Sequence, residues 1–112
     1  MKILYIEDHE QLAKTVQGYL QDHGHEVVWA DKISRALEEM SNDRFDGIIC
    51  DGTLDPKNRN DGFRFVQQLL TQGKKVVLFS TMRPVDVPEG MPFVWKNSKD
   101  APDLLLEKLL AL

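Results

Sequence analysis

Residues 3–8 read Ile-Leu-Tyr-Ile-Glu-Asp, so an apolar run of four residues ends abruptly in two acids. Short, nearly continuous apolar runs that are rich in β-branched and aromatic residues are typical of strands buried on both faces of a parallel sheet. Similar runs follow at residues 27–29, 48–50, 76–79 and 93–95. The sequence therefore predicts five buried strands, of which residues 3–6 form the first.

Between these runs, apolar side chains recur three or four positions apart, which is the spacing of a helix with one buried face. Gly24 and Gly73 follow two of these stretches and are suited to end a helix. The apolar residues of the predicted helices lie within residues 12–20, 33–40, 63–70 and 104–112. Alternating strands and helices of this kind predict a doubly wound α/β fold with right-handed crossovers.

The last helix has a clear start, whereas no helix is expected before the fifth strand. Asp100 is suited to cap the last helix, and Pro102 fits its first turn. Residues 81–92 contain three prolines, and a proline inside a helix costs ~3 kcal/mol. We therefore expect a loop or a single turn in place of a fourth crossover helix.

Length and composition limit what the chain can be. With 112 residues, it should fold as one domain, residues 1–112, with ~6,300 Å² of surface. The net charge is −4 and no basic stripe is present, which argues against nucleic-acid binding. Cys50 is the single cysteine, so internal disulfides and thiolate zinc clusters are excluded. No apolar run is long enough for a signal peptide or a membrane span, and we expect a cytoplasmic domain without membrane partners.

Polar side chains follow four of the five predicted strands. Glu7 and Asp8 follow the first, Asp51 the third, Ser80 the fourth and Lys96 the fifth. Ligands of open α/β sheets bind outside the carboxyl ends of the strands, so we expect these side chains to meet at one rim.

This set of residues points to phosphoryl chemistry. Clustered carboxylates repel one another unless a cation neutralises them, and ligands that offer only oxygen favour Mg²⁺. A carboxylate can attack phosphorus to form an acyl phosphate. A lysine and a hydroxyl could then stabilise the transferring group.

The set Glu7, Asp8, Asp51, Ser80 and Lys96, each after its strand, resembles the receiver domain of two-component response regulators. The resemblance covers nearly the whole chain. It implies a flavodoxin-like five-stranded parallel sheet with strand order 2-1-3-4-5, here in a stand-alone, atypical form whose fourth helix is missing or reduced to a turn. It also implies phosphorylation of Asp51 by a histidine kinase or a histidine phosphotransfer protein, and a changed affinity for a downstream protein partner.

The resemblance assigns a role to each site residue. Asp51 would accept the phosphoryl group, and Ser80 and Lys96 would contact it. Mg²⁺ would be bound by Glu7, Asp8, Asp51 and the backbone carbonyl of Thr53. Phe93 would be the aromatic switch residue. Such a protein phosphorylates itself on Asp51 and is not a turnover enzyme; it could form a homodimer.

Residues 52–61 form a longer loop than receiver domains usually have between the third strand and the third helix. Its charged residues, Asp55, Lys57, Arg59 and Asp61, predict a mobile, solvated segment. This loop and the missing helix are departures from the family pattern, and so is Asn97, which follows Lys96 where the family usually has proline.

Parts of the sequence are also compatible with two other functions. A receiver-like fold could serve as a docking or dimerisation module without phosphorylation, which the missing helix would favour and the complete set of site residues opposes. Residues 50–54, Cys-Asp-Gly-Thr-Leu, are similar to part of the signature of haloacid-dehalogenase-type phosphatases. The nucleophilic aspartate of that signature is replaced here by Ile49, so we reject this reading.

Overall fold

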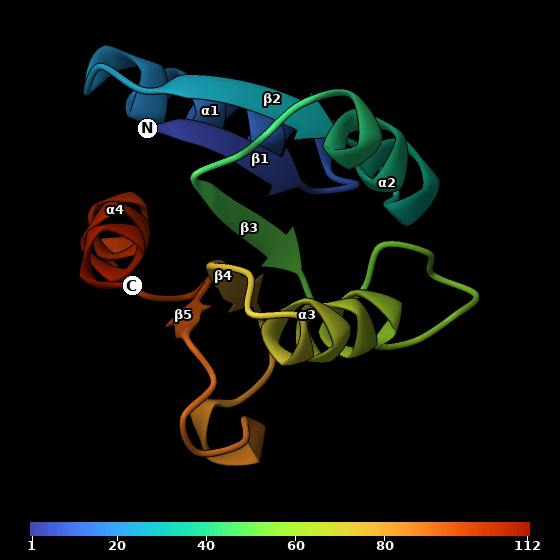
Figure 1. Ribbon diagram of the computed structural model, residues 1–112. Coiled ribbons are helices and arrows are strands. Elements are labelled where there is room, and N and C mark those ends of the chain that lie inside the picture. The colour runs from blue at the N-terminus through green and yellow to red at the C-terminus, as the bar shows by residue number, and fades with distance from the viewer.

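The computed structural model describes residues 1–112 and contains the predicted alternation of strands and helices. Figure 1 shows their arrangement around one twisted sheet. The strands are β1 (Lys2–Ile6), β2 (Glu26–Ala30), β3 (Gly47–Asp51), β4 (Val76–Ser80) and β5 (Phe93–Trp95). The helices are α1 (Glu10–Asp22), α2 (Ile33–Asn42), α3 (Asp61–Thr71) and α4 (Ala101–Ala111), with a short 3₁₀ turn η1 (Pro84–Asp86).

The sheet has the order β2-β1-β3-β4-β5, and every strand pair is parallel. This confirms the predicted doubly wound, flavodoxin-like fold. All residues of β3 and β4 are buried, because helices cover both faces of the central strands. The nearly continuous apolar runs in the sequence are explained by this burial on both sides. The surface area of 6566 Å² is close to the expected value.

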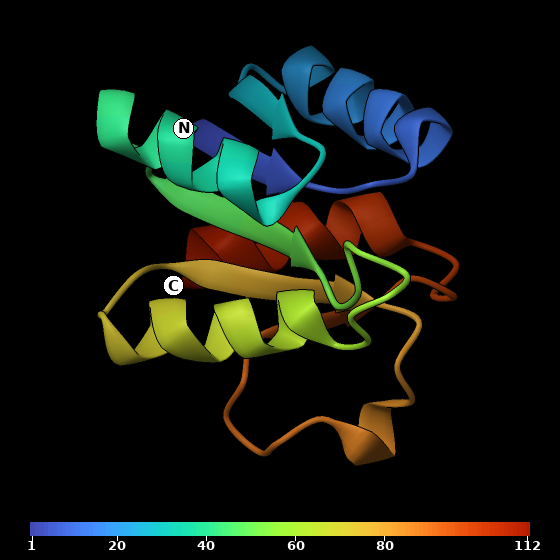
Figure 2. The same ribbon diagram turned by 90° about the vertical axis from the view of Figure 1, so that its right-hand side faces the viewer.

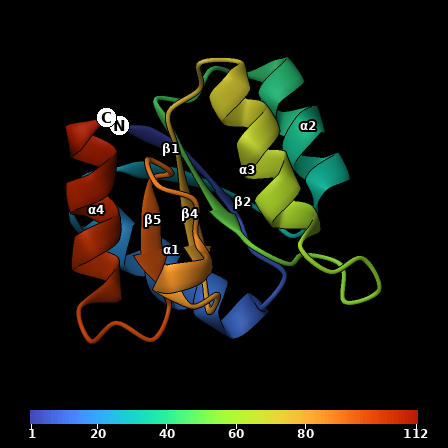
Figure 3. The same ribbon diagram turned by 90° about the horizontal axis from the view of Figure 1, so that it is seen from below.

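Two hydrophobic cores lie on opposite faces of the sheet. One joins α1 and α4 to the side chains of Tyr5, Ile49 and Phe79. The other joins α2 and α3 to Leu4 and Leu78. Figure 3 shows α2 and α3 together on one side of the sheet and α4 on the other. Successive side chains of each strand therefore point into opposite cores. Only the side chains at or just after the end of a strand are left to face the rim of the sheet.

The helix ends follow the expected rules with one exception. Gly24 and Gly73 adopt positive φ angles of 87° and 77° just after α1 and α3, as a glycine can without strain. Asp100 occupies the position before α4, but its side chain makes no capping hydrogen bond, so the predicted cap is wrong in this detail. Pro102 lies in the first turn, where the missing N–H costs nothing.

No helix connects β4 to β5. Residues 81–92 form a loop that contains only the single turn η1, and Figure 2 shows this loop projecting from the edge of the sheet below α3. The prediction of a lost fourth helix is therefore confirmed. The prolines explain the loss, because they remove main-chain donors and restrict the residues before them.

Candidate functional site

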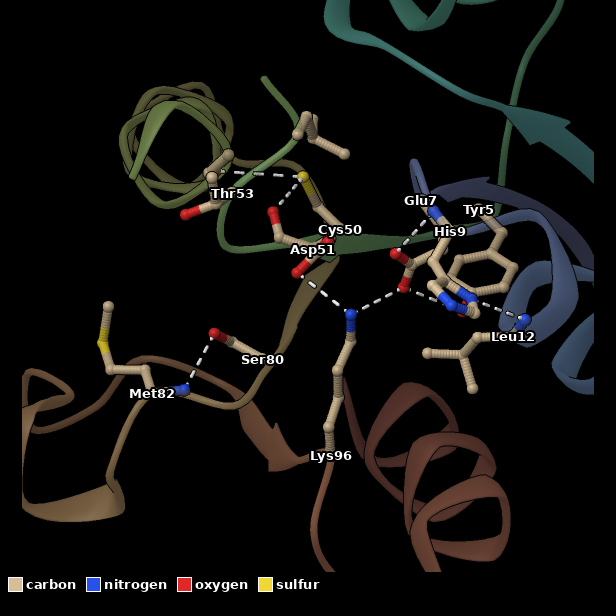
Figure 4. A network of polar contacts seen from close by, with 12 residues as sticks. Tyr5, Glu7, His9, Leu12, Cys50, Asp51, Thr53, Ser80, Met82 and Lys96 are labelled. Atoms are coloured by element: carbon tan, nitrogen blue, oxygen red, sulfur yellow. Dashed lines mark hydrogen bonds and ion pairs between the residues drawn. The ribbon is translucent and has the colours of Figure 1, made fainter. Parts of the chain in front are cut away.

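The carboxyl ends of four parallel strands bring the predicted polar residues to one rim. Asp51 and Ser80 are the last residues of β3 and β4, while Glu7 and Lys96 directly follow β1 and β5. Figure 4 shows the side chains of Glu7, Asp51 and Lys96 pointing toward one another, with Ser80 nearby. Parallel strands produce this convergence because all their carboxyl ends lie at the same edge.

Lys96 is the bridge between the acids. Its ammonium Nζ lies 2.8 Å from Glu7 Oε1 and 3.1 Å from Asp51 Oδ1. The ammonium also lies 5.5 Å from the centre of the Phe79 ring, which supports it by a cation–π contact. Burial opposes the Lys96 charge, but the hydrogen bond to Glu7 and the charge of Asp51 outweigh it, so its pKa is raised. The contact with Asp51 was expected from the resemblance, whereas the contact with Glu7 was not predicted.

Glu7 is fully buried and held by several donors. The Tyr5 hydroxyl donates to Oε1 over 3.3 Å, and the His9 backbone N–H donates to Oε2 over 3.2 Å. The Trp29 indole N–H donates to the Glu7 backbone carbonyl over 2.8 Å. The roles of Tyr5 and Trp29 as supports of Glu7 were not predicted from the sequence. Tyr5 looked like any other core residue of β1, and no local signal tells a buried tyrosine that contacts an acid from one that does not.

The pKa of the Asp51 carboxyl group is raised well above its usual value. Its side chain is 11% exposed. Burial raises its pKa from 3.8 to about 8, and the neighbouring Glu7 charge adds to the rise while Lys96 opposes it. Without a further cation, the site therefore tends to hold a proton on Asp51 near neutral pH. A second positive charge at this position would release that proton.

The three acids form a group that could hold such a cation. One carboxylate oxygen from each of Glu7, Asp8 and Asp51 lies within 4.8 Å of the other two. Glu7 and Asp51 are buried, whereas Asp8 is exposed and can reach solvent. A donor set made only of oxygens, with access to water, fits Mg²⁺, which keeps several water ligands and binds few carboxylates. Thr53, predicted to add its backbone carbonyl, lies two residues after Asp51.

The loop after β3 is anchored more firmly than predicted. Asp61 is buried, and its carboxylate accepts hydrogen bonds from the backbone N–H groups of Leu54 (2.7 Å) and Asp55 (3.2 Å). The Thr53 hydroxyl oxygen accepts from the Asn60 N–H over 3.1 Å. Placing Asp61 among the solvated charges was therefore wrong. An unpaired N–H at buried Leu54 would be costly, and the Asp61 carboxylate prevents this cost.

Gly62 permits the close approach of α3 to the end of β3. A Cβ atom at Gly62 would lie 1.8 Å from the backbone oxygen of Asp51, a distance that no side chain can occupy. Glycine is therefore required for α3 to pack here. The requirement for glycine at position 62 was not predicted from the sequence, since a glycine near the start of a helix can have many causes.

Ser80, Phe93 and Cys50 lie where the strands were expected to place them. Ser80 is buried, and its Oγ accepts a hydrogen bond from the Met82 N–H over 3.0 Å, which leaves the hydroxyl proton available. Phe93 is half-buried in β5 and packs against the core under α2 and α3. Cys50 is a fully buried core residue, as predicted, and burial raises the pKa of its thiol.

A doubly wound sheet with two acids after β1, an aspartate at the end of β3 and a lysine after β5 is the arrangement of a receiver domain. The sequence matches the family described as "Response regulator receiver domain" over residues 3–89. The chain therefore belongs to this family. No curated protein matches the sequence.

Solved receiver structures share the fold along nearly the whole chain. Chemotaxis protein CheY4 of Vibrio cholerae is 28% identical, with a TM-score of 0.78 over 98% of this chain and 96% of that one. The BeF₃-activated receiver domain of RstA from Klebsiella pneumoniae is 23% identical, with a TM-score of 0.78 over 99% and 97%. TrrA from Thermotoga maritima, solved with Mg²⁺–BeF, is 19% identical, with a TM-score of 0.77 over 96% and 97%.

None of the α-helices combines the length and the apolar character that crossing a membrane requires.

Proposed function

We propose that Asp51 accepts a phosphoryl group from a phosphohistidine of a kinase or a phosphotransfer protein, and that this changes the affinity of the domain for a downstream protein. The observation that carries the proposal is the position of Lys96. Its ammonium contacts both Glu7 and Asp51, so positive charge already stands beside the acceptor carboxylate. Fixed positive charge at this point stabilises negative charge that develops on a transferring phosphoryl group.

The transfer itself needs few groups. A carboxylate oxygen of Asp51 forms a bond to phosphorus while the phosphorus–nitrogen bond of the donor breaks. The imidazole nitrogen keeps the electron pair and takes a proton from solvent. Lys96, which lies 3.1 Å from Asp51, and the hydroxyl of Ser80, whose proton is not used by the bond to Met82, would bind oxygens of the phosphoryl group. Asp51 is itself modified, so the domain would act once per phosphorylation and not as a turnover enzyme.

The acids would hold Mg²⁺ through Glu7, Asp8 and Asp51, with the Thr53 carbonyl as a further ligand. When bound, the ion would supply positive charge to the oxygens of the transferring group. Ionisation of Asp51 is needed for this role, because a protonated carboxyl is neither a good ligand nor a good nucleophile. The 3.1 Å contact between the Lys96 ammonium and Asp51 Oδ1 would keep the acceptor side chain oriented before the ion binds.

The direct test is phosphorylation by a small phosphodonor in the presence of Mg²⁺, read as a gain in intact mass. Wild type should gain one phosphoryl group, and Asp51→Asn should gain none. Asp55→Asn is the matched control, because Asp55 is an exposed aspartate of the neighbouring loop outside the acid group. It should be phosphorylated like wild type. Partner switching is tested by a pull-down with and without beryllofluoride, and equal capture in both would contradict it.

The alternative is a docking module that works without phosphorylation. It is favoured by one observation, the replacement of the fourth helix by the loop that holds η1. Absence of any mass gain under saturating donor and Mg²⁺ would support this alternative and overturn the proposal.

A further inference from the structure

The hydroxyl of Tyr5 is a polar group in an otherwise apolar core. Tyr5 is fully buried in β1. Among the thirteen buried residues of the core that joins α1 and α4 to the sheet, it is the only one whose side chain carries a polar atom. A buried tyrosine hydroxyl needs a hydrogen-bond partner, and the partner here is Glu7 Oε1, 3.3 Å away. The ring therefore serves the core, whereas the hydroxyl serves the rim of the sheet.

Glu7 Oε1 is shared between two donors. The Lys96 ammonium lies 2.8 Å from this oxygen, and Figure 4 shows the ammonium and the Tyr5 ring approaching Glu7 from different sides. A carboxylate oxygen can accept two hydrogen bonds, so these two donors fill its capacity. The Tyr5 bond is longer than the about 2.7 Å that is usual between a hydroxyl and a carboxylate. It is therefore below its full strength while Lys96 shares the oxygen.

Lys96 has two tasks that compete. Its ammonium contacts Glu7 Oε1 and also lies 3.1 Å from Asp51 Oδ1. In the proposed function it turns toward oxygens of the phosphoryl group on Asp51, which weakens its bond to Glu7. Glu7 is fully buried, so water cannot replace the lost donor, and a buried charge without a partner is costly. Release of Lys96 therefore requires another donor for Oε1.

We propose that Tyr5 is a positioning residue for phosphoryl transfer, and that its hydroxyl takes over Glu7 Oε1 when Lys96 turns toward the phosphoryl group. This role rests on the proposed function, since it assigns a further residue to that reaction. The hydroxyl remains a donor because burial, and then the charge of Glu7, raise the pKa of Tyr5. By holding Glu7 in place, Tyr5 lowers the cost of moving Lys96.

The first test reads the Tyr5 hydrogen bond in wild type. The chain has two tyrosines, so ¹³C labelling of tyrosine Cζ, the carbon that bears the hydroxyl, gives two NMR signals, and Tyr19→Phe identifies that of Tyr5. Beryllofluoride is added to protein in saturating Mg²⁺. The Tyr5 signal should then move downfield, because a stronger bond to the carboxylate draws the phenol toward phenolate. The Tyr19 signal should stay in place, because its hydroxyl donates to Asp103 of α4, outside the acid group.

The second test is Tyr5→Phe, which keeps the ring and removes only the hydroxyl. With acetyl phosphate and saturating Mg²⁺, the maximal rate of mass gain should fall about five-fold, the effect of one hydrogen bond of ordinary net strength. The donor concentration that gives half the maximal rate should not change, because buried Tyr5 cannot touch the donor. Tyr19→Phe is the matched control and should keep the wild-type rate.

A Tyr5 signal that stays in place or moves upfield would overturn this role, and a mass gain on Asp51 in the same protein would leave the proposed function standing. An unchanged maximal rate in folded Tyr5→Phe would overturn it as well. If Tyr5→Phe does not fold, the spectrum of wild type decides alone. Absence of any mass gain in wild type would overturn the proposed function and the role of Tyr5 with it.

Discussion

Asp51→Asn is expected to stabilise the metal-free protein against unfolding, and the gain should grow as the pH rises. Asp51 ends β3 within a buried group of acids, and its pKa is raised to about 8, mainly by burial and then by the charge of Glu7. In the unfolded chain the same carboxyl group loses its proton near pH 3.8. Asparagine has the same shape and brings no charge into the site.

The magnitude follows from the two pKa values. Between pH 4 and 8 the folded protein keeps a proton that the unfolded chain has released, so the stability contributed by this proton falls by up to about 1.4 kcal/mol per pH unit. The stabilising contribution of the Asp51 proton is fully present below about pH 4 and is lost as the pH rises through about 8. The whole difference between the two pKa values, 3.8 and about 8, would correspond to a loss of about 6 kcal/mol in the free energy of unfolding. Solvent contact and Lys96 reduce this, and we expect about 1–3 kcal/mol between pH 5 and 8.5.

The assay is urea unfolding of wild type, Asp51→Asn and Asp55→Asn in chelator at pH 5, 7 and 8.5. The free energy of unfolding of wild type should fall relative to that of Asp51→Asn across this range, while exposed Asp55→Asn runs parallel to wild type. Added Mg²⁺ should stabilise wild type at high pH, because a ligand that binds only the folded state shifts the equilibrium toward it. Parallel curves for wild type and Asp51→Asn would refute the reasoning.

Three further substitutions test the supports of the site. Lys96→Met should destabilise the protein by about 3 kcal/mol in urea unfolding, because it leaves Glu7 buried without its cation; an unchanged midpoint would contradict this. Gly62→Ala should lower stability by at least about 2 kcal/mol and abolish the proposed phosphorylation, since its Cβ clashes with the backbone of Asp51 at the end of β3. The control Gly18→Ala, which meets no atom within 4 Å, should instead stabilise α1 by about 0.5–1 kcal/mol. Asp61→Ala should cost about 2 kcal/mol and speed hydrogen exchange of the two loop amides it accepts from; unchanged exchange would exclude its anchoring role.

The fold was predictable because its signals are local. Each strand is a short apolar run buried on both faces, and the turn at the end of a helix is set by residues such as Gly24. The prolines of residues 81–92 are equally local and predicted the lost helix. Asp100 shows the limit of such rules: its position before α4 was right, but whether its side chain turns toward the helix depends on its surroundings.

The candidate site was predictable as a set of strand ends and not as a network. Parallel strands bring Asp51 and Lys96 to one rim whatever the details of packing. The supporting contacts depend on distances across the fold. The Tyr5 hydroxyl reaches Glu7 only because both side chains are enclosed, and Asp61 is buried only because its loop folds back on itself. Residue type alone carries no sign of either arrangement.

The strand at the open edge of the sheet, β5, has only three residues and directly follows Pro92. A strand of another molecule could form very few main-chain hydrogen bonds with β5, so this edge is a poor site for aggregation by strand addition. Replacement of the fourth crossover helix by the loop of residues 81–92 therefore does not create an edge that promotes aggregation. A protein that binds this edge must contact side chains and loops instead of extending the sheet. Because Lys96 of the candidate site directly follows β5, a change at the site would alter the surface that such a protein contacts.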